Sequence, residues 1–459
     1  MVQPMDKSKM ITILVASILV IAGISVVFYM FSNAGNNDRR ALLSDSLEVY
    51  GNANDDWTID NKDVEYIERI ISGEVEESQF ADANRDGKID SKDIDQIRAL
   101  ANDTATEVYL IDGVGETMKV NCKPQRVHVF QTQNAEIAAI MQIGQYVVSA
   151  GPPIKHYADW FFPPGKKESI VYTQYDYEIL TEMDLDLYLV FAPSQKDDPT
   201  DKLPDVDVVY LGLYTPVTDN LERSTYGQGI LKAGYIFGCK DRAEGYLNFL
   251  LEIRDEIQKR TALIPDDEKV NVLTSGYSRY FKDENDKTVT VCLESETTSQ
   301  AAALAGARNV AEILPSWSGA SYSQVADLEW LDTVDIDWVT LHYNYYEWSG
   351  EPMFPAGGFS IKDPVEMYQA LDDIATRPLL GDLNHDQIMI LPQEFRNGST
   401  GGVLLAAYLA KAFYPEYFAD FNPDAYMEEF IKEWWGVKNY NFEEYNAFIA
   451  YGNLKNSQS

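Results

Sequence analysis

Two short runs of the chain place oxygen-bearing side chains at the spacing that a calcium ion requires. The run DANRDGKIDSKD has Gly87 at position 6 of an EF-hand loop, where the chain must turn sharply. Ile89 follows at position 8, where it can anchor the loop on a small core. The expected calcium ligands are Asp82, Asn84, Asp86, Lys88 through its backbone carbonyl, Asp90 and Asp93.

A weaker form of the same pattern lies upstream, in the run NANDDWTIDNKD. Trp57 stands where the glycine is expected, and Asn52 replaces the first aspartate. Because this loop has fewer carboxylates, we expect it to hold calcium less tightly than the second loop. Its expected ligands are Asn52, Asn54, Asp56, Thr58 through its backbone carbonyl, Asp60 and Asp63.

Each loop leads into a segment whose apolar residues have helical spacing, Val64 to Ile71 after the first and Ile94 to Leu100 after the second. Two loop-helix units that end in Asp rather than Glu resemble a dockerin, the calcium-dependent module that binds cohesin domains. The resemblance covers residues 44–103. It implies a small all-α module that binds structural Ca²⁺ and has a cohesin-type protein as a partner. Trp57 departs from the dockerin pattern.

An apolar segment precedes the calcium loops. Met10 to Phe31 contains no charged residue and is long enough to cross a bilayer as a helix, which takes about 20 residues. We therefore expect residues 1–35 to form an uncleaved membrane anchor, with a signal segment cleaved after Ala34 as the alternative. Because weak calcium sites fill at extracellular calcium concentrations, we expect the rest of the chain at the extracellular face of the cell membrane.

The composition of the chain excludes nucleic acids as partners. The net charge is -36 over 459 residues, so a nucleic-acid backbone would be repelled. The three cysteines, Cys122, Cys239 and Cys292, are widely spaced and odd in number, which is typical of buried small residues rather than of a metal site or a disulfide framework. The residues that follow the calcium loops are too many for one core, so two lobes are expected.

Apolar runs alternate with helical patterns over this remainder of the chain. The segment VYLIDGVGETMKV is typical of a β-hairpin. The alternation of strands and helices predicts parallel α/β sheets. Strands are expected at residues 127–130, 187–191, 208–211, 270–274, 337–341 and 387–391, and helices at residues 135–143 and 241–261.

Several of these segments are similar to one family. PQRVHVFQTQNAEIAAIMQIGQYVVSAG, DYEILTEMDLDLYLVF, ARNVAEIL with VADLEWLDTVDIDWVTL, and LLAAYLAKAFYPEYF resemble ABC-transporter substrate-binding proteins of the siderophore, haem and cobalamin class. Asp335 and Ile336 stand where that family usually has Asn-Pro. The resemblance implies an α/β fold of two Rossmann-like lobes joined by a long helix. Its parts would be a first lobe at about 107–225, linking helices at 226–262 and a second lobe at 268–453.

In such a fold, loops at the carboxyl ends of the strands of both lobes face each other across a cleft. Aromatic and cationic side chains at these positions suit a planar or chelated ligand that is partly anionic, such as an iron chelate, haem or a corrinoid. The expected ligand-binding residues are Gln131, His156, Tyr157, Tyr175, Tyr277, Arg279, His342, Tyr343, Trp348 and Arg396.

The resemblance also implies an ABC permease as a partner. A glutamate on the outer surface of each lobe pairs with permease arginines in that family, and the matching positions are Glu136 and Glu329. Either glutamate could instead be a solvated carboxylate at the start of a helix, where the helix dipole favours it.

Two functions therefore remain open. The chain has no H-E-x-x-H, G-x-S-x-G or P-loop motif, so we expect no enzyme activity. The first interpretation is an anchored extracellular binding protein that delivers a metal chelate to an importer. The alternative is a dockerin-bearing component of a cell-surface assembly that binds a protein or a glycan.

Overall fold

The structure is a computed structural model, and the residues that it describes belong to one compact unit. The predicted anchor from Met10 to Phe31 lies outside the described residues. Within the part of the chain that the structure describes, no helix is both long and apolar enough to cross a membrane. The described residues are 43–156, 158–173, 175–214, 216–276, 288–314, 323–331, 333–343, 387–397 and 400–441.

The two helices predicted after the calcium loops are confirmed as α2 (Asn61–Ile71) and α3 (Ser91–Ala101). Both begin with the same capping box, in which an aspartate at the N-cap and an aspartate three residues later satisfy each other's backbone N–H groups. Ile67 of α2 and Ile97 of α3 are fully buried in the same core. The two loop-helix units thus pack as a pair.

A β-hairpin follows, as the sequence predicts. Strands β1 (Glu107–Ile111) and β2 (Thr117–Asn121) pair in antiparallel register. The turn is closed by Asp112, which accepts hydrogen bonds from the backbone of Val114 and Glu116. The hairpin also connects the calcium module to the rest of the molecule, because Tyr50 donates its backbone N–H to Tyr109 at 2.9 Å.

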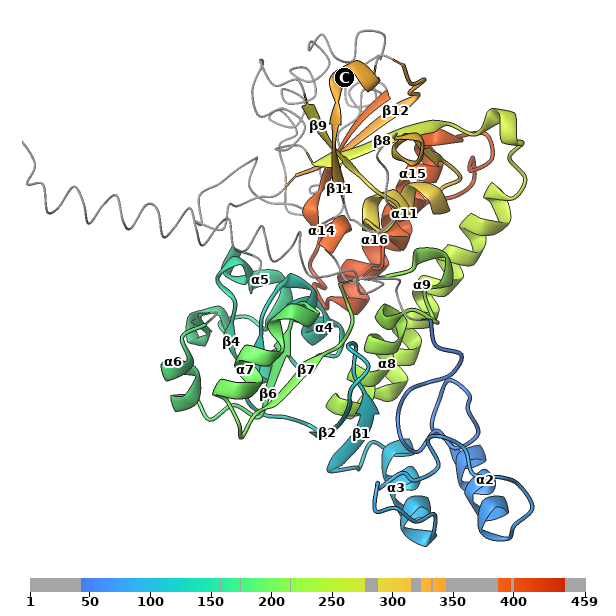
Figure 1. The fold of residues 1–459 in the computed structure, drawn as a ribbon. Coiled ribbons are helices and arrows are strands. Elements are labelled where there is room, and N and C mark those ends of the chain that lie inside the picture. The colour runs from blue at the N-terminus through green and yellow to red at the C-terminus, as the bar shows by residue number, and fades with distance from the viewer. Residues whose placement is uncertain are drawn as a thin grey trace, which may run out of the picture. The chain divides into compact units, whose positions relative to one another are not determined.

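The first lobe is built on a five-stranded sheet in which every pair of neighbouring strands is parallel. The strand order is β5-β4-β3-β6-β7, and Figure 1 shows helices α4 to α7 around these strands. The strands are β3 (Val127–Val129), β4 (Val147–Ala150), β5 (Val171–Tyr172), β6 (Leu187–Val190) and β7 (Asp207–Tyr210). The helices are α4 (Thr132–Ile140), α5 (Ala158–Phe161), α6 (Tyr177–Glu182) and α7 (Asp197–Lys202).

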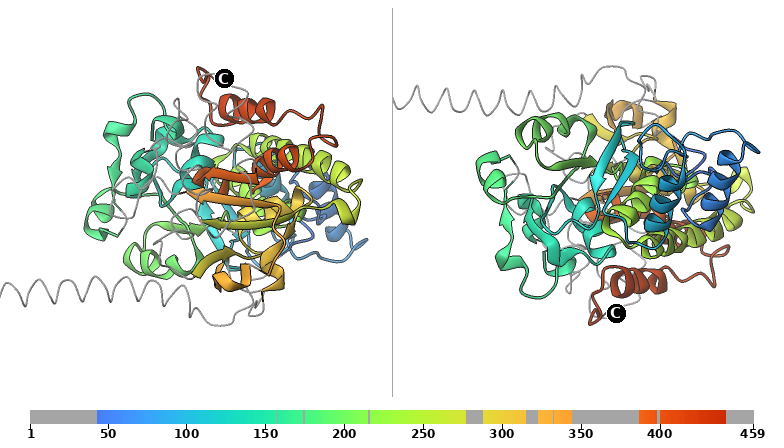
Figure 2. Two further views of the ribbon diagram at one scale, coloured as in Figure 1. Left: turned by 90° about the horizontal axis from the view of Figure 1, so that it is seen from above. Right: turned by 90° about the horizontal axis from the view of Figure 1, so that it is seen from below.

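The second lobe has a six-stranded sheet that is mixed rather than purely parallel. The main order is β11-β9-β8-β12-β13, with β10 also paired to β8. Its strands, yellow to orange-red, lie side by side in the left view of Figure 2. They are β8 (Asn271–Gly276), β9 (Thr288–Cys292), β10 (Arg308–Asn309), β11 (Ser323–Asp327), β12 (Trp338–Tyr343) and β13 (Ile388–Pro392).

The expectation of a parallel second sheet is therefore wrong in part. Strands β9 and β11 pair with each other in antiparallel register, and β9 is antiparallel to β8. Antiparallel strands at the edge of an otherwise parallel sheet are common in large α/β sheets. The helices of this lobe are α11 (Thr297–Leu304), α12 (Leu328–Leu331), α14 (Gln393–Asn397), α15 (Val403–Phe413) and α16 (Pro423–Glu429).

Two helices connect the lobes, as predicted. Helix α8 (Thr225–Phe237) ends at Gly238, whose φ of 68° lies in the left-handed region that a helix C-cap requires. Helix α9 (Lys240–Thr261) has 22 residues and is about 33 Å long. Its buried residues include Tyr246, Phe249, Leu250, Ile253 and Ile257. Short 3-10 helices lie at Gly144–Tyr146, Pro152–His156, Lys167–Ser169, Pro193–Gln195, Thr218–Asn220, Asp266–Glu268 and Val310–Ile313, and a π-helix at Phe430–Trp434.

The calcium module packs against these connecting helices. The backbone N–H of Ile59 donates to the Tyr235 hydroxyl at 2.8 Å, and the Thr58 hydroxyl donates to Glu244 at 2.6 Å. Lys232 of α8, only 2% exposed, forms an ion pair with Glu48 at 2.7 Å. Apolar residues of the module belong to the same core cluster as those of α8 and α9. The module is thus part of the folded body of the protein.

Candidate functional site

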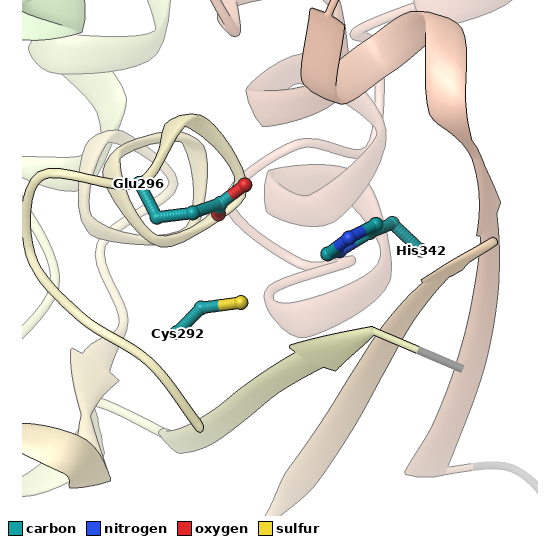
Figure 3. Close-up of side chains that lie close together, drawn as sticks. All are labelled: Cys292, Glu296 and His342. Atoms are coloured by element: carbon teal, nitrogen blue, oxygen red, sulfur yellow. The ribbon is translucent and has the colours of Figure 1, made fainter. Parts of the chain in front are cut away.

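The ends of two strands and the start of a helix bring three metal-binding side chains together in the second lobe. Cys292 is the last residue of β9, His342 is the next-to-last residue of β12, and Glu296 directly precedes α11. Their side chains converge (Figure 3), and their ligand atoms lie within 4.8 Å of one another. All three residues are buried. The register partner of His342 on β8 is Gly276, which has no side chain and so leaves room between the strands.

Glu296 is held in place by a dense set of hydrogen bonds. One carboxylate oxygen, Oε2, accepts from the backbone N–H groups of Thr298 at 2.7 Å and Ser299 at 3.3 Å, and so caps α11. The Thr298 hydroxyl donates to the same oxygen. Helix α11 is fixed to the sheet because the hydroxyls of Ser299 and Thr274 lie 2.7 Å apart. The carboxylate therefore has a defined position beside the strand ends.

The other carboxylate oxygen of Glu296, Oε1, accepts a hydrogen bond from Nε of Arg396 at 2.7 Å. Burial by itself raises the pKa of Glu296, but the charges of Arg396 and His342 and the hydrogen bonds outweigh burial, so its pKa is lowered. Burial lowers the pKa of Arg396, but the charge of Glu296 reverses this effect and the pKa is raised. The pair is thus charged at neutral pH.

The donor set of this cluster is suited to soft or borderline divalent metals. A thiolate, an imidazole and a carboxylate are ligands of Zn²⁺, and thiolate with imidazole also suits Co²⁺ and Ni²⁺. Among the described residues, the cluster is the one group of His, Cys, Asp and Glu side chains whose ligand atoms converge this closely. Cys292, His342 and Glu296 could therefore hold a metal ion.

The equivalent edge of the first lobe is aromatic. Gln131 lies two residues after β3, is largely buried and precedes α4 without a side-chain cap. Tyr175 is 51% exposed and packs its ring against Phe130, with the ring centroids 5.5 Å apart. This edge thus presents an exposed aromatic ring, which can contact a planar ligand.

Of the ten predicted ligand-binding residues, the structure brings His342 and Arg396 together around Glu296 in the second lobe. Gln131 and Tyr175 lie at the strand ends of the first lobe. The side chains of His156 and Tyr343 lie outside what the structure describes, as do Tyr157, Tyr277, Arg279 and Trp348 entirely.

Sequence reasoning missed two members of the cluster. Cys292 was assigned only as a buried small residue, and Glu296 was not singled out. A signal was present, because Cys292 ends an alternating apolar run and Glu296 precedes a Thr-Thr-Ser helix start. The helix-start pattern could have marked Glu296, whereas the strand-end rule does not apply to Cys292, because Cys292 ends an antiparallel strand.

In the second predicted calcium loop, backbone N–H groups donate to carboxylates of the loop itself. Oδ1 of Asp82 accepts from the backbone N–H of Asp86 at 3.1 Å, and Oδ2 accepts from Gly87 at 3.0 Å. Asp93 is fully buried, and its oxygens accept from the backbone of Asn84 and Asp90. Burial raises the pKa of the Asp93 carboxyl. A buried carboxylate of this kind fits a cation, so the residues present fit Ca²⁺.

The first loop has similar hydrogen bonds from its backbone to its own side chains but differs at its first position. The Asn52 amide donates to the backbone oxygens of Leu47 and Asp56, each at 2.8 Å. An aspartate could not donate these two bonds. Burial raises the pKa of Asp63, the last ligand position, to about 6. The first loop is therefore stabilised by its own amide, and its weaker calcium binding stays a prediction.

The surface position expected for Glu136 is wrong. Glu136 is fully buried, and every residue of α4 from Gln133 to Ile140 is buried with it. A helix that is apolar on all sides is covered on all sides. Glu329 is exposed on α12, as a docking glutamate would be.

The two lobes contain an equivalent pair of acidic positions. Asp186 accepts the backbone N–H groups that precede β3, and Asp337 accepts the N–H of Asn271 at the start of β8. Glu178 precedes Asp186, and Glu329 precedes Asp337, by the same eight residues. Glu178 is exposed on α6. By this internal repeat, Glu178 and not Glu136 is the first-lobe counterpart of Glu329.

No protein-family model matches the chain, and no curated protein matches it. Solved structures do match it. A TroA-like periplasmic binding protein, FepB from Veillonella parvula, aligns with a TM-score of 0.55 at 14% identity over 75% of this chain and 99% of the solved chain. This chain has the fold of periplasmic binding proteins.

Two further structures of this fold were solved with a bound solute. Helicobacter pylori CeuE with Ni(II) bound aligns with a TM-score of 0.52 at 13% identity over 74% of this chain and 99% of CeuE. Haemophilus influenzae MolA bound to molybdate aligns with a TM-score of 0.53 at 17% identity over 72% of this chain and 98% of MolA. At these identities the likeness concerns the fold.

Proposed function

We propose that the protein is the solute-binding subunit of an ABC importer and that it captures a metal chelate, such as an iron chelate, haem or a corrinoid. The observation that carries this proposal is the placement of binding groups at the strand ends of each lobe. Tyr175 and Gln131 lie at this edge of the first lobe, and His342 and Arg396 lie at this edge of the second. In open α/β sheets, ligands bind outside the carboxyl ends of the strands.

The fold neighbours support the same reading. CeuE carries Ni(II), and MolA carries molybdate and belongs to an ABC transporter. A partly anionic ligand stays a prediction from the resemblance, because the charge of Arg396 is already paired with Glu296.

Docking to a permease is proposed to use Glu178 and Glu329. Both carboxylates are exposed, and they occupy equivalent positions in the two lobes. Charged groups at such a contact contribute to specificity and to the rate of association.

The test is permease-stimulated ATP hydrolysis with the double variant Glu178→Gln, Glu329→Gln. We expect the double variant to bind its solute normally and to lose stimulation. Glu182→Gln with Glu416→Gln is the matched control, since it removes the same charge from exposed positions elsewhere in the two lobes. Full stimulation by the docking variant would contradict the importer assignment.

The calcium loops and the anchor complete the proposal. We propose that the loops hold structural Ca²⁺ outside the cell, with the second loop binding more tightly, and that residues 10–31 tether the protein to the membrane. A cohesin-type partner is the less favoured alternative, because part of the module surface already contacts Tyr235 and Glu244 of the connecting helices.

A further inference from the structure

We propose that Cys292, His342 and Glu296 coordinate a thiophilic divalent metal ion directly. This inference rests on the proposed function and deepens it. The captured solute would contain a metal with open coordination positions, of the Co²⁺, Ni²⁺ or Zn²⁺ class, rather than a saturated chelate held only by aromatic and cationic contacts.

The location of the cluster supports a role in solute binding. Cys292 and His342 come from strands on either side of β8. His342 lies at the carboxyl end of the parallel strand β12, whereas Cys292 ends β9, which is antiparallel to β8 and pairs with it through Val291 and Ser275. Glu296 approaches the same place from the start of α11 (Figure 3). Because the fold places ligands at the carboxyl ends of its parallel strands, a metal ion held by His342 would lie next to the binding edge.

Metal coordination would require only small movements of the three side chains. The ligand atoms lie within 4.8 Å of one another. Tetrahedral donors at about 2.0 to 2.3 Å from a zinc-like ion are roughly 3.3 to 3.8 Å apart. Side-chain rotations that close the cluster by about 1 Å would therefore complete three protein ligands. A fourth position would remain for a donor atom of the captured solute.

The ion pair between Glu296 and Arg396 is compatible with metal binding. A carboxylate has about four lone-pair sites, and Oε1 of Glu296 uses one of them for Arg396. Arg396 then acts as a positioning residue that orients the carboxylate, as the hydrogen-bond partners of metal ligands commonly do. In the absence of metal, the same pair neutralises a carboxylate that would otherwise be buried and unpaired.

The donor set separates this site from the calcium loops. The loops offer oxygen ligands, which hard cations prefer, whereas Cys292 offers sulfur and His342 offers nitrogen. A metal with a bond to sulfur can therefore be assigned to this cluster by its spectrum. Cys122 and Cys239 are the two other cysteines, and neither belongs to the cluster.

The test is a Co²⁺ titration of the reduced full chain with the calcium loops first saturated by Ca²⁺. We expect an intense thiolate-to-Co²⁺ charge-transfer band in the near ultraviolet, together with visible bands typical of four-coordinate Co²⁺. One equivalent of Zn²⁺ should remove both. Cys292→Ser should abolish the charge-transfer band, and His342→Gln should shift the visible bands and weaken Co²⁺ binding.

Cys122→Ser and Cys239→Ser are the matched controls and should keep the full spectrum. If Cys292→Ser fails to fold, as judged by circular dichroism, Cys292→Ala replaces it. Absence of a charge-transfer band in the reduced wild type, or an unchanged band in the folded Cys292 variant, would overturn the inference.

Failure of the inference can be distinguished from failure of the proposed function. A protein that stimulates its permease but gives no sulfur-to-metal band keeps the importer function and loses the metal site. A protein that gives the Cys292-dependent band but does not stimulate a permease keeps the metal site and loses the importer function.

Discussion

At the scale of single residues, Glu296 makes three kinds of contact at once. It caps α11, pairs with Arg396 and faces Cys292 and His342. Its carboxylate is almost fully buried, so the charged form of this carboxylate depends on the positive charge of Arg396. Removing one member of such a pair leaves an uncompensated charge in a poorly solvated place.

Arg396→Met should therefore destabilise the protein by about 3 kcal/mol or more, because the Glu296 carboxylate would lose its cation. Urea unfolding at neutral pH measures this change. The double variant Arg396→Met, Glu296→Ser removes both charges and keeps an N-cap hydroxyl for α11, so it should recover part of the loss. A single variant as stable as the wild type would show that the pair is not formed.

The buried imidazole of His128 makes the free energy of unfolding depend on pH. It lies in β3, stacks on Tyr188 with ring centroids 4.1 Å apart and contacts the Ser149 hydroxyl at 2.9 Å. Burial lowers its pKa from 6.5 to about 3. Between these two values the unfolded chain takes up a proton that the folded chain does not. His128 therefore contributes stability above pH 6.5 that is lost as the pH falls toward 3.

Unfolding free energies measured at pH 7 and pH 4.5 test this effect. We expect His128 to account for a loss of about 2 to 3 kcal/mol over that interval, which His128→Phe should abolish. Ser149→Ala is the control, because it keeps the imidazole and should retain the wild-type slope. Equal slopes in the wild type and His128→Phe would contradict the assignment.

At the scale of elements, the calcium loops set the start of two helices. Because the proposed Ca²⁺ ligands Asp90 and Asp93 also form the capping box of α3, we expect metal binding and helix formation to be coupled. With Ca²⁺ at about 100 times the dissociation constant, binding should raise the unfolding free energy by about 2.7 kcal/mol.

Asp86→Ala should remove the tighter Ca²⁺ site and most of this stabilisation, as measured by calorimetric titration and by urea unfolding with and without Ca²⁺. Asp95→Ala is the matched control, since Asp95 is an exposed aspartate of α3 outside the loop. If Asp86→Ala bound Ca²⁺ like the control, the second loop would not be a calcium site.

The spacing of apolar residues was sufficient to predict the helices and strands whose apolar pattern is long or repeated. Helices α2, α3 and α9, the hairpin and the central strands of both sheets follow from the spacing of their apolar residues. Strands β9 and β11 could not be placed, because alternation does not encode the direction of a pairing partner.

Only part of the candidate site could be predicted from the sequence. His342 and Arg396 follow from the strand-end rule, whereas Glu296 acts through a cap and an ion pair that form only in three dimensions. Glu136 was misplaced because a carboxylate in an otherwise apolar helix does not reveal from sequence that the helix is covered on all sides.

At the scale of the whole molecule, the calcium module is joined to the helices that connect the lobes. Ile59 and Glu48 of the module contact Tyr235 and Lys232 of α8. The module and the binding lobes therefore share one core, and calcium binding is expected to stabilise the folded body rather than a separate appendage.

The central claim is that this body captures a metal-containing solute. The most direct measurement is native mass spectrometry, with metal analysis, of the protein purified from its source without chelators. The account predicts an added mass that contains a transition metal, beyond the mass of bound Ca²⁺. A protein that repeatedly carries only Ca²⁺, and that gains no mass when offered iron chelates, haem, corrinoids, Co²⁺ or Ni²⁺, would contradict it.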